Sequence, residues 1–292
     1  MRAPSAGPAA RQNEAITARL REAAQVLEQQ RANPFRIRAF RRAADTIEGL
    51  PDDIGELVAR GGPEALRGLP GIGPGIAAAV HEILATGRWG MLERLRGTLD
   101  PEHLLRSVPG VGRVLAGRIH DALQVDSLEA LESAAHDGRL ASVPGMGARR
   151  VAMISATLAG MLGRRRLVRP AAEPPVAVLL GVDEEYRRKV RAGRLVRIAP
   201  RRFNPSGRRW LPVLHTERGP WHFTALFSNT ARAHELGRTR DWVVVYFHAD
   251  HEVEGQRTIV TETHGPLAGG RVVRGREGEC PVPGERASDS GS

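Results

Sequence analysis

The stretch LPGIGPGIAAAV, from Leu69 to Val80, places three glycines and two prolines directly before a run of helix-forming residues. Glycine reaches backbone conformations that other residues avoid, and proline suits the first turn of a helix, so the pattern predicts a tight loop that opens a helix. The arrangement returns as VPGVGRVLAGRI from Val108 and as VPGMGARRVAMI from Val143, and the leading glycines are 39 and 35 residues apart. The repeat predicts three helix–loop–helix units.

Each loop combines two features that favour anions. A helix begins with free backbone N–H groups and the positive end of its dipole, and glycine, which has no Cβ, lets another backbone come close. Together they can hold a phosphate without any side-chain charge and without reference to a base. The apolar residue between the glycines is predicted to plug into the core: Ile72, Val111 and Met146.

The surrounding sequence from residue 13 to residue 163 has a helical period throughout. Asn33 and Pro34 form a helix start, and Ser127 caps another helix. The apolar face predicted for the helix after Asn33 consists of Phe35, Ala39, Phe40, Ala43 and Ile47.

The period changes to two after a proline-rich stretch that follows Arg164. VAVLLGV and RLVRIAPRR are predicted strands, with a helix over DEEYRRKVRAG between them. LPVLHTERGPWHFTALFS predicts a hairpin that turns near Gly219 and Pro220, WVVVYFH and RTIVTETHG predict a second one, and NTARAHEL a short helix.

These patterns predict an α+β protein: an all-α half with three hairpins, followed by a smaller α+β domain with antiparallel strands. The expected divisions are a disordered tail at 1–12, a helical domain with the first hairpin at 13–97, a tandem-hairpin domain at 98–165, a linker at 166–175, an α+β domain at 176–280 and a second tail at 281–292.

Composition limits the class of protein and its surroundings. The formal net charge of +10 favours an anionic partner such as nucleic acid. The sequence contains no run of about 18 apolar residues, so no membrane span is predicted. The amino terminus lacks the apolar stretch of a secretory signal. The single cysteine, Cys280, fits a reducing cytoplasm and makes no thiolate zinc site. We expect a cytoplasmic, nucleoid-associated protein.

The Pro-Gly-apolar-Gly loops resemble the helix-hairpin-helix motif of DNA repair and replication proteins; the alternative is three turns that use glycine for geometry alone. Residues 13–165 as a whole resemble the amino-terminal region of bacterial family X DNA polymerases. NPFRIRAFRRAADTIEGLP, LPGIGPGIAAAVHEILATGRWGMLERL and VPGVGRVLAGRIHDAL carry that resemblance, which covers about half the chain.

The resemblance implies binding of DNA, whether double-stranded, gapped or nicked, without sequence preference, and a repair protein as a further partner. It assigns the contacts to the backbone amides of Gly71, Gly73, Gly75, Gly110, Gly112, Gly145 and Gly147. It also implies a monovalent cation, K⁺ or Na⁺, on the backbone carbonyls of Arg67, Leu69 and Ile72, and no other cofactor.

Arginines near the loops add candidate phosphate contacts. Arg113, Arg149 and Arg150 follow the second and third loops, where they either reach flanking phosphates or form a solvated surface. Arg36 and Phe40 match the 5′-phosphate pocket of the resembled family, but Gly75 stands at its second basic position.

The catalytic signatures of that family are missing. Ala79 stands where some members carry the lyase lysine, and the only lysine of the chain is Lys189, in the other half. Arginine stays protonated and cannot replace the amine nucleophile. The Asp-x-Asp signature that two-metal polymerisation needs does not occur in the sequence, nor does the His-x-His start of the attached phosphoesterase. We therefore expect DNA binding without polymerase or lyase activity.

Two features of the carboxy-terminal half leave alternatives open. HADHEVE brings together His248, Asp250, His251 and Glu252, which would suit a divalent ion in a metal-dependent nuclease or form a solvated hairpin end. APRRFNPSGRRW sets four arginines around a turn that either binds a phosphate backbone or stays solvated. The aromatic residues Trp210, Trp221, Trp242, Tyr246 and Phe247 are expected to pack in the core or on the sheet face, and the alternative is an aromatic-plus-arginine face that stacks single-stranded bases. A third class is a protein–protein adaptor, because hairpin repeats sometimes bind proteins.

Overall fold

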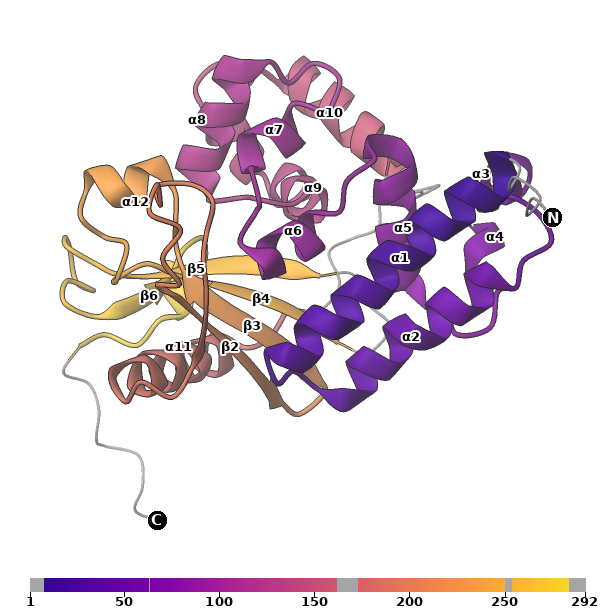
Figure 1. Cartoon of the computed structure of the whole chain (residues 1–292). Coiled ribbons are helices and arrows are strands. Elements are labelled where there is room, and N and C mark those ends of the chain that lie inside the picture. The colour runs from indigo at the N-terminus through magenta and orange to yellow at the C-terminus, as the bar shows by residue number, and fades with distance from the viewer. Residues whose placement is uncertain (1–7, 63, 162–172, 250–253, 284–292) are drawn as a thin grey trace, which may run out of the picture.

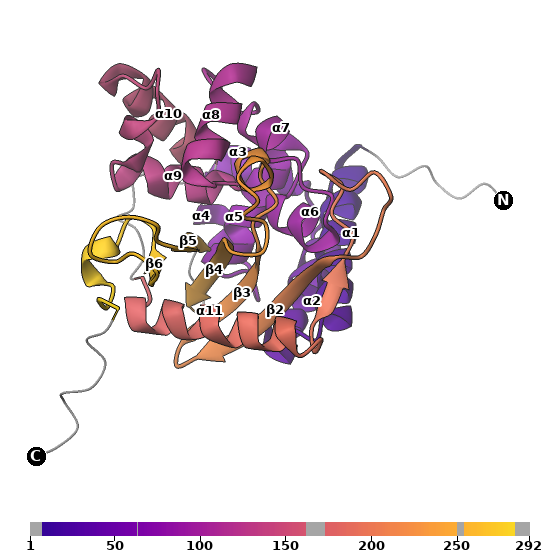
Figure 2. The same cartoon turned by 90° about the vertical axis from the view of Figure 1, so that its left-hand side faces the viewer.

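The structure is a computed structural model that describes residues 8–62, 64–161, 173–249 and 254–283. Its fold is α+β, as the sequence predicts, with two helical units followed by a six-stranded antiparallel sheet. Figure 1 shows the sheet at the centre, with the helical units on one side of it and helix α11 along the other. The turned view in Figure 2 shows the same arrangement.

The first helical unit consists of α1 (Pro8–Gln29), α2 (Pro34–Glu48), α3 (Ile54–Gly61), α4 (Glu64–Arg67), α5 (Pro74–Thr86) and α6 (Gly90–Arg96). Helix α1 begins at Pro8, so the helix starts five residues before Asn13, inside the stretch predicted as a tail. The predicted start of α2 is confirmed, because the side chain of Asn33 accepts a hydrogen bond from the amide of Phe35 at 2.6 Å.

The predicted apolar face of α2 is wrong at its first residue. Phe35 is 74% exposed, whereas Ile37 and Phe40 are buried. Five residues of helix turn a side chain well away from the starting direction, so Phe35 cannot share the face that Phe40 presents to α1. The chain at Phe35 therefore carries an aromatic ring in solvent, with the Arg38 guanidinium 4.4 Å from its centre.

The second helical unit consists of α7 (Pro101–Leu105), α8 (Arg113–Leu123), α9 (Leu128–His136), the 3₁₀ turn η1 (Arg139–Ser142) and α10 (Ala148–Met161). Ser127 caps α9 as predicted, accepting a hydrogen bond from the amide of Ala130 at 3.1 Å. Leucines and valines of this unit form a core distinct from that of the first unit.

The sheet is an antiparallel meander in which each strand pairs with the next. Its elements are β1 (Val196–Ile198), β2 (Leu211–Arg218), β3 (Trp221–Phe227), β4 (Val243–Ala249), β5 (Gly255–Thr261) and β6 (Arg271–Val273), with α12 (Ala231–Glu235) between β3 and β4 and the 3₁₀ turn η2 (Glu277–Glu279) after β6. Both predicted hairpins are confirmed, and Arg218 pairs with Trp221 across the turn at Gly219 and Pro220.

The strand predicted over VAVLLGV is wrong, because this stretch begins α11 (Val176–Arg191). A short apolar run fits a buried strand and a buried helix equally well, and periodicity alone cannot separate them. Here Val176, Leu179, Val182 and Tyr186 recur at helical spacing and pack on the sheet. The other predicted strand of this region is confirmed as β1.

A buried polar cluster joins the two helical units to the sheet. Arg94 of α6 is 4% exposed, forms an ion pair with Glu254, and lies with its guanidinium carbon 3.5 Å from the centre of the Tyr246 ring. Tyr246 donates a hydrogen bond to Asp126, which precedes α9 and lies 3.6 Å from Arg94. Burial raises the pKa of Asp126 to about 6, even though Arg94 and Tyr246 favour its charged form.

Candidate nucleic-acid interface

The three glycine loops adopt the same turn. In each, the residue before proline accepts a hydrogen bond from the apolar residue three positions on: Leu69 from Ile72 at 3.2 Å, Val108 from Val111 at 3.0 Å, and Val143 from Met146 at 2.9 Å. The leading glycines have φ values of 76° at Gly71, 86° at Gly110 and 90° at Gly145. This backbone requires glycine, which explains the first glycine of every repeat.

The second glycine of each loop stands at the start of the following helix. Gly73 and Gly112 are the N-cap residues of α5 and α8, and neither helix has a side-chain cap. A Cβ built at Gly112 or at Gly147 would meet no atom within 4 Å, so space is open in front of α8 and α10. The apolar residues between the glycines are buried as predicted: Ile72, Val111 and Met146.

The second and third hairpins interlock through equivalent side chains. Met153 of α10 covers Gly110 so closely that a Cβ there would overlap its methyl group. In return, Arg118 of α8 covers Gly145, with Nη1 3.2 Å from where a Cβ would lie, and donates to the carbonyl of Pro144 at 3.3 Å. Each covering residue is the eighth after the leading glycine of its own loop, so the two hairpins form a pseudo-symmetric pair.

The arginines predicted beside these loops are exposed. No acidic side chain in the described part of the chain pairs with Arg113, Arg149 or Arg150, and Arg150 donates to the carbonyl of Gly145. Sequence reasoning missed Arg106 and Arg118, which are exposed on the same two hairpins. Arg118 could have been found from the sequence, because Arg118 and Met153 are each the eighth residue after the leading glycine of their loop.

Charge in the tandem is segregated. Residues 102–159 contain six arginines and six acidic residues, so the formal charge of the unit is zero. Several carboxylates are turned toward the sheet domain or to local partners: Glu102 pairs with Arg202 at 2.8 Å, and Asp137 pairs with Arg139 at 2.7 Å and with Arg257 at 3.6 Å. The glycine loops are therefore left with arginines around them.

The first hairpin has different surroundings. Gly71, Gly73 and Gly75 line a cleft of about 850 Å³ whose far wall includes Pro220 and His248 of the sheet domain. The side chain of Arg42 packs against Gly71, with Cδ 3.2 Å from where a Cβ would lie. The sheet domain faces the first glycine loop across this cleft, so the three loops are not equally open.

Arg36 lies in the same cleft but does not stand free. Its side chain is 15% exposed and its Nη2 lies 3.6 Å from Glu254. Burial lowers the pKa of Arg36, against the opposing effect of Glu254, and nearby Arg94 lowers it further. The Arg36 guanidinium, predicted to contact a phosphate, is thus paired with the Glu254 carboxylate of the other half.

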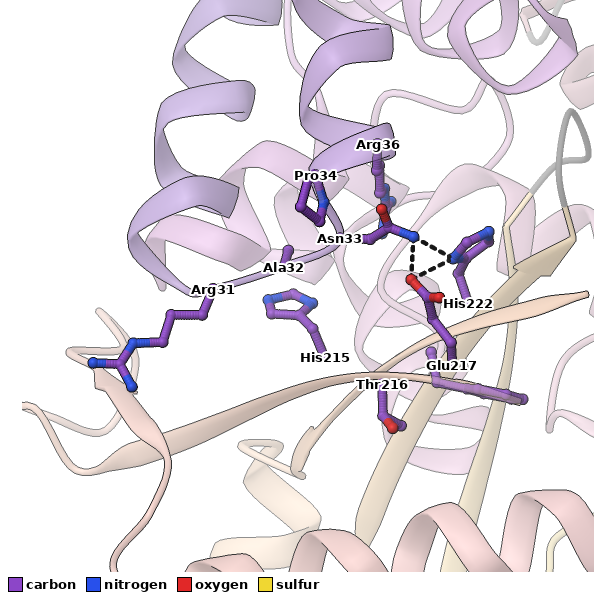
Figure 3. Close-up of a pocket in the computed structure, with 10 residues that line it drawn as sticks. Arg31, Ala32, Asn33, Pro34, Arg36, His215, Thr216, Glu217 and His222 are labelled. Carbon is purple, nitrogen blue, oxygen red and sulfur yellow. Dashed lines mark hydrogen bonds and ion pairs between the residues drawn. The ribbon is translucent and has the colours of Figure 1, made fainter. Parts of the chain in front are cut away.

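A smaller pocket of about 330 Å³ lies between the start of α2 and strands β2 and β3. Figure 3 shows Asn33 pointing at Glu217 and His222 from opposite walls, with Arg31 directed away. Asn33 donates to Glu217, whose carboxylate lies 3.3 Å from His222. Below them, half-buried His215 contacts Gln30 at 3.0 Å, and this pocket wall ties the helical half to the sheet.

The predicted nuclease cluster is described only in part, because Asp250, His251 and Glu252 lie outside the described residues. His248 is at the end of β4, where its ring stacks on that of His222 with centres 5.0 Å apart. In the described ranges no group of three His, Cys, Asp or Glu side chains is placed to hold a metal ion.

The monovalent cation predicted at the first hairpin would use backbone carbonyls. The Leu69 carbonyl accepts the Ile72 amide and keeps one lone pair, so its oxygen still suits an alkali ion.

The paired glycine loops define a class of structure, the tandem helix-hairpin-helix. Comparison with protein families agrees: residues 102–159 match the SAM-like helix-hairpin-helix tandem, and residues 11–89 match a helix-hairpin-helix domain. Domains of this kind generally bind nucleic acid, which supports DNA as a partner. No curated protein matches the chain. None of the described helices combines the length and hydropathy needed to cross a bilayer.

Proposed function

We propose that this protein binds DNA without sequence preference, through the tandem hairpins of residues 102–159, in the service of DNA repair or replication. The observation that carries the proposal is the reciprocal packing of the two loops, which presents the open glycine positions Gly112 and Gly147 on one unit. Amides in front of α8 and α10 suit phosphates, and a pseudo-symmetric pair of loops suits the two symmetric backbones of a duplex.

The arginines supply the electrostatic part of the binding. Arg113, Arg149 and Arg150 would neutralise phosphates on either side of the loops and release counterions, so affinity should fall steeply with salt. Phosphate contacts carry no sequence information, which is why we expect no preference among duplexes. The repair or replication role and the absence of catalysis rest on the resemblance to the polymerase amino-terminal region, and the K⁺ or Na⁺ site at the first hairpin belongs to the same proposal.

Fluorescence anisotropy with duplexes of unrelated sequence, titrated at several salt concentrations, tests the proposal. We expect equal affinities, and the double variant Arg149→Ala/Arg150→Ala should lower the slope of log affinity against log salt by about two. The matched control, Arg191→Ala/Arg194→Ala, removes two exposed arginines at the end of α11, on the other side of the sheet. Absent binding, or equal effects of both double variants, would refute the proposal.

A second candidate, a metal-dependent nuclease, is favoured by one observation. His248, which begins the HADHEVE stretch, lines the same cleft as the glycines of the first hairpin. Incubation of nicked and gapped DNA with Mg²⁺ or Mn²⁺ separates the two functions. Cleavage that His248→Ala abolishes would establish the nuclease, and intact DNA after incubation would remove it.

A further inference from the structure

The loop that connects β1 to β2, residues 199–210, contains an unusual aromatic residue. Phe203 has a φ of 53°, in the left-handed region that a bulky side chain avoids. Its side chain is nevertheless 46% exposed, so the strained backbone does not serve to bury the ring. Residues held in such conformations concentrate at functional sites, where the surroundings over-determine them.

Hydrogen bonds hold the 199–210 loop in this shape. Asn204 is buried and its amide donates to the carbonyls of Pro200 and Arg208, both at 2.9 Å, while its oxygen accepts the amide of Arg208 at 3.1 Å. From outside the loop, Asn229 donates to the carbonyl of Arg202 at 3.1 Å. The ring of Phe203 is therefore presented to solvent by a rigid loop.

Two side chains of the protein lie against the Phe203 ring. The ring of His234 lies beside it with centres 4.3 Å apart, and the guanidinium carbon of Arg202 lies 5.2 Å from the centre of Phe203. Burial, and to a lesser degree Arg202, lowers the pKa of His234. His234 therefore stays neutral at physiological pH and supports the ring without adding charge.

The 199–210 loop also carries arginines that are free of carboxylates among the described residues. Arg201, Arg208 and Arg209 are exposed, and none of them has an acidic partner within the ranges that the structure describes. An aromatic face flanked by arginines is the combination with which proteins hold unpaired nucleic acid, because bases stack on the ring and phosphates meet the charges.

The 199–210 loop also lies beside the second hairpin. Arg202 pairs with Glu102 at 2.8 Å, and Glu102 reaches to 4.0 Å from where a Cβ of Gly117 would lie. Gly117 is five residues along α8 from Gly112, which is about 7.5 Å of helix. A strand that leaves the second hairpin along α8 can therefore reach Phe203 within a few nucleotides.

We propose that Phe203 is a stacking site for an unpaired DNA strand that continues from the duplex held by the tandem hairpins. The DNA structure that fits this site is a duplex with an adjoining single-stranded segment. This inference rests on the proposed function, which it deepens by naming the DNA structure, and Arg201, Arg208 and Arg209 would hold the phosphates of the unpaired strand.

The test compares a blunt duplex, the same duplex with a thymidine tail, and the free thymidine oligonucleotide by fluorescence anisotropy. We expect the full chain to prefer the tailed duplex. Phe203→Gly should lower affinity for the tailed duplex and for the oligonucleotide about tenfold, the effect of losing one stacked base, and leave the blunt duplex unchanged. Phe203→Tyr should bind as the parent does.

Two controls separate stacking from structure. Leu236→Ala removes an apolar side chain that is also 46% exposed, and it should leave all three affinities unchanged. Because glycine accepts a positive φ, Phe203→Gly should not lower the unfolding midpoint, whereas loss of a merely structural ring would. Unchanged affinity of Phe203→Gly for the tailed duplex, or a lowered midpoint with equal losses on all DNAs, would overturn the inference. If no duplex is bound the proposed function fails, and the oligonucleotide still decides the role of Phe203.

Discussion

Met153 of α10 lies directly over Gly110 in the neighbouring hairpin, at the same position of the repeat from which Arg118 covers Gly145. Each hairpin thus completes the loop of the other, and neither loop is held by its own helices alone. Because the contact is reciprocal, the pair presents its amides as one rigid surface. The first hairpin has Arg42 over Gly71 in place of such a partner.

The two glycines of the second loop should behave differently when replaced. Gly110→Ala should reduce the free energy of unfolding by about 1–2 kcal/mol, because its left-handed backbone disfavours a side chain. At Gly112, where φ is −79° and a Cβ meets nothing within 4 Å, alanine should have only the smaller effect of a weaker helix cap. Urea unfolding measures both.

Gly112→Ala is also the sharper probe of function. Its added methyl group stands where a phosphate would approach the amides of α8, so duplex affinity should fall although the fold is kept. Anisotropy on a blunt duplex provides the measurement. Parent-like affinity of a folded Gly112→Ala protein would show that the loop amides do not meet the DNA backbone.

The first hairpin should contribute less to duplex affinity than the tandem hairpins do. Arg42 and Arg67 lie in the cleft of the first hairpin, which faces the sheet domain, so Arg42→Ala/Arg67→Ala should weaken duplex binding less than Arg149→Ala/Arg150→Ala does. The two double variants remove the same charge, and comparing them at one salt concentration controls for net charge. Equal losses would mean that the cleft opens to admit a duplex.

Arg94 should be among the most sensitive positions for stability. Arg94→Met leaves the buried carboxylate of Asp126 without a cation and leaves Glu254 with Arg36 alone, and breaking a buried pair in this way costs about 3–5 kcal/mol. As a control, Arg21→Met breaks exposed pairs with Asp45 and Glu48 and should reduce the free energy of unfolding far less, because water screens exposed ion pairs. Denaturant unfolding of both variants checks the contrast, and similar losses would contradict it.

Stability should fall on acidification because of His215. Burial lowers the pKa of His215 from 6.5 to about 3. Between these pH values the unfolded chain binds a proton at His215 and the folded protein does not. The stability due to the neutral ring is fully present above pH 6.5 and is lost as the pH falls toward 3. His120, with a pKa lowered to about 4 by burial, acts in the same direction.

Asp126 has the opposite effect on stability. Because its pKa is raised to about 6, its contribution to the free energy of unfolding decreases as the pH rises from 3.8 through 6.

Replacing His215 separates its effect on stability from those of the other titrating groups. Between pH 6.5 and about pH 5, His215→Gln should lose about 2 kcal/mol less stability than the parent. His264→Gln, at an exposed histidine, provides the control. A variant with the parent's pH dependence would show that His215 is not the neutral buried group.

Local rules suffice for the loops. Proline and glycine at adjacent positions dictate the turn at Gly71, Gly110 and Gly145, and the apolar residue between the glycines can only point inward, so sequence reasoning reaches the hairpins and their glycines. The cap at Asn33 and the strand hairpin at Gly219 follow from the same short-range chemistry. The sequence by itself therefore determined three hairpins and an α+β fold.

Tertiary structure alone decided which hairpins are free. The contact of Met153 with Gly110, the engagement of Arg36 with Glu254, and the wall that the sheet domain sets before the first hairpin all join residues far apart in the chain. Such contacts depend on which faces meet when the units pack, and no local pattern encodes that. The helix at Val176 shows the same limit, because an apolar run becomes helix or strand according to the surface that covers it.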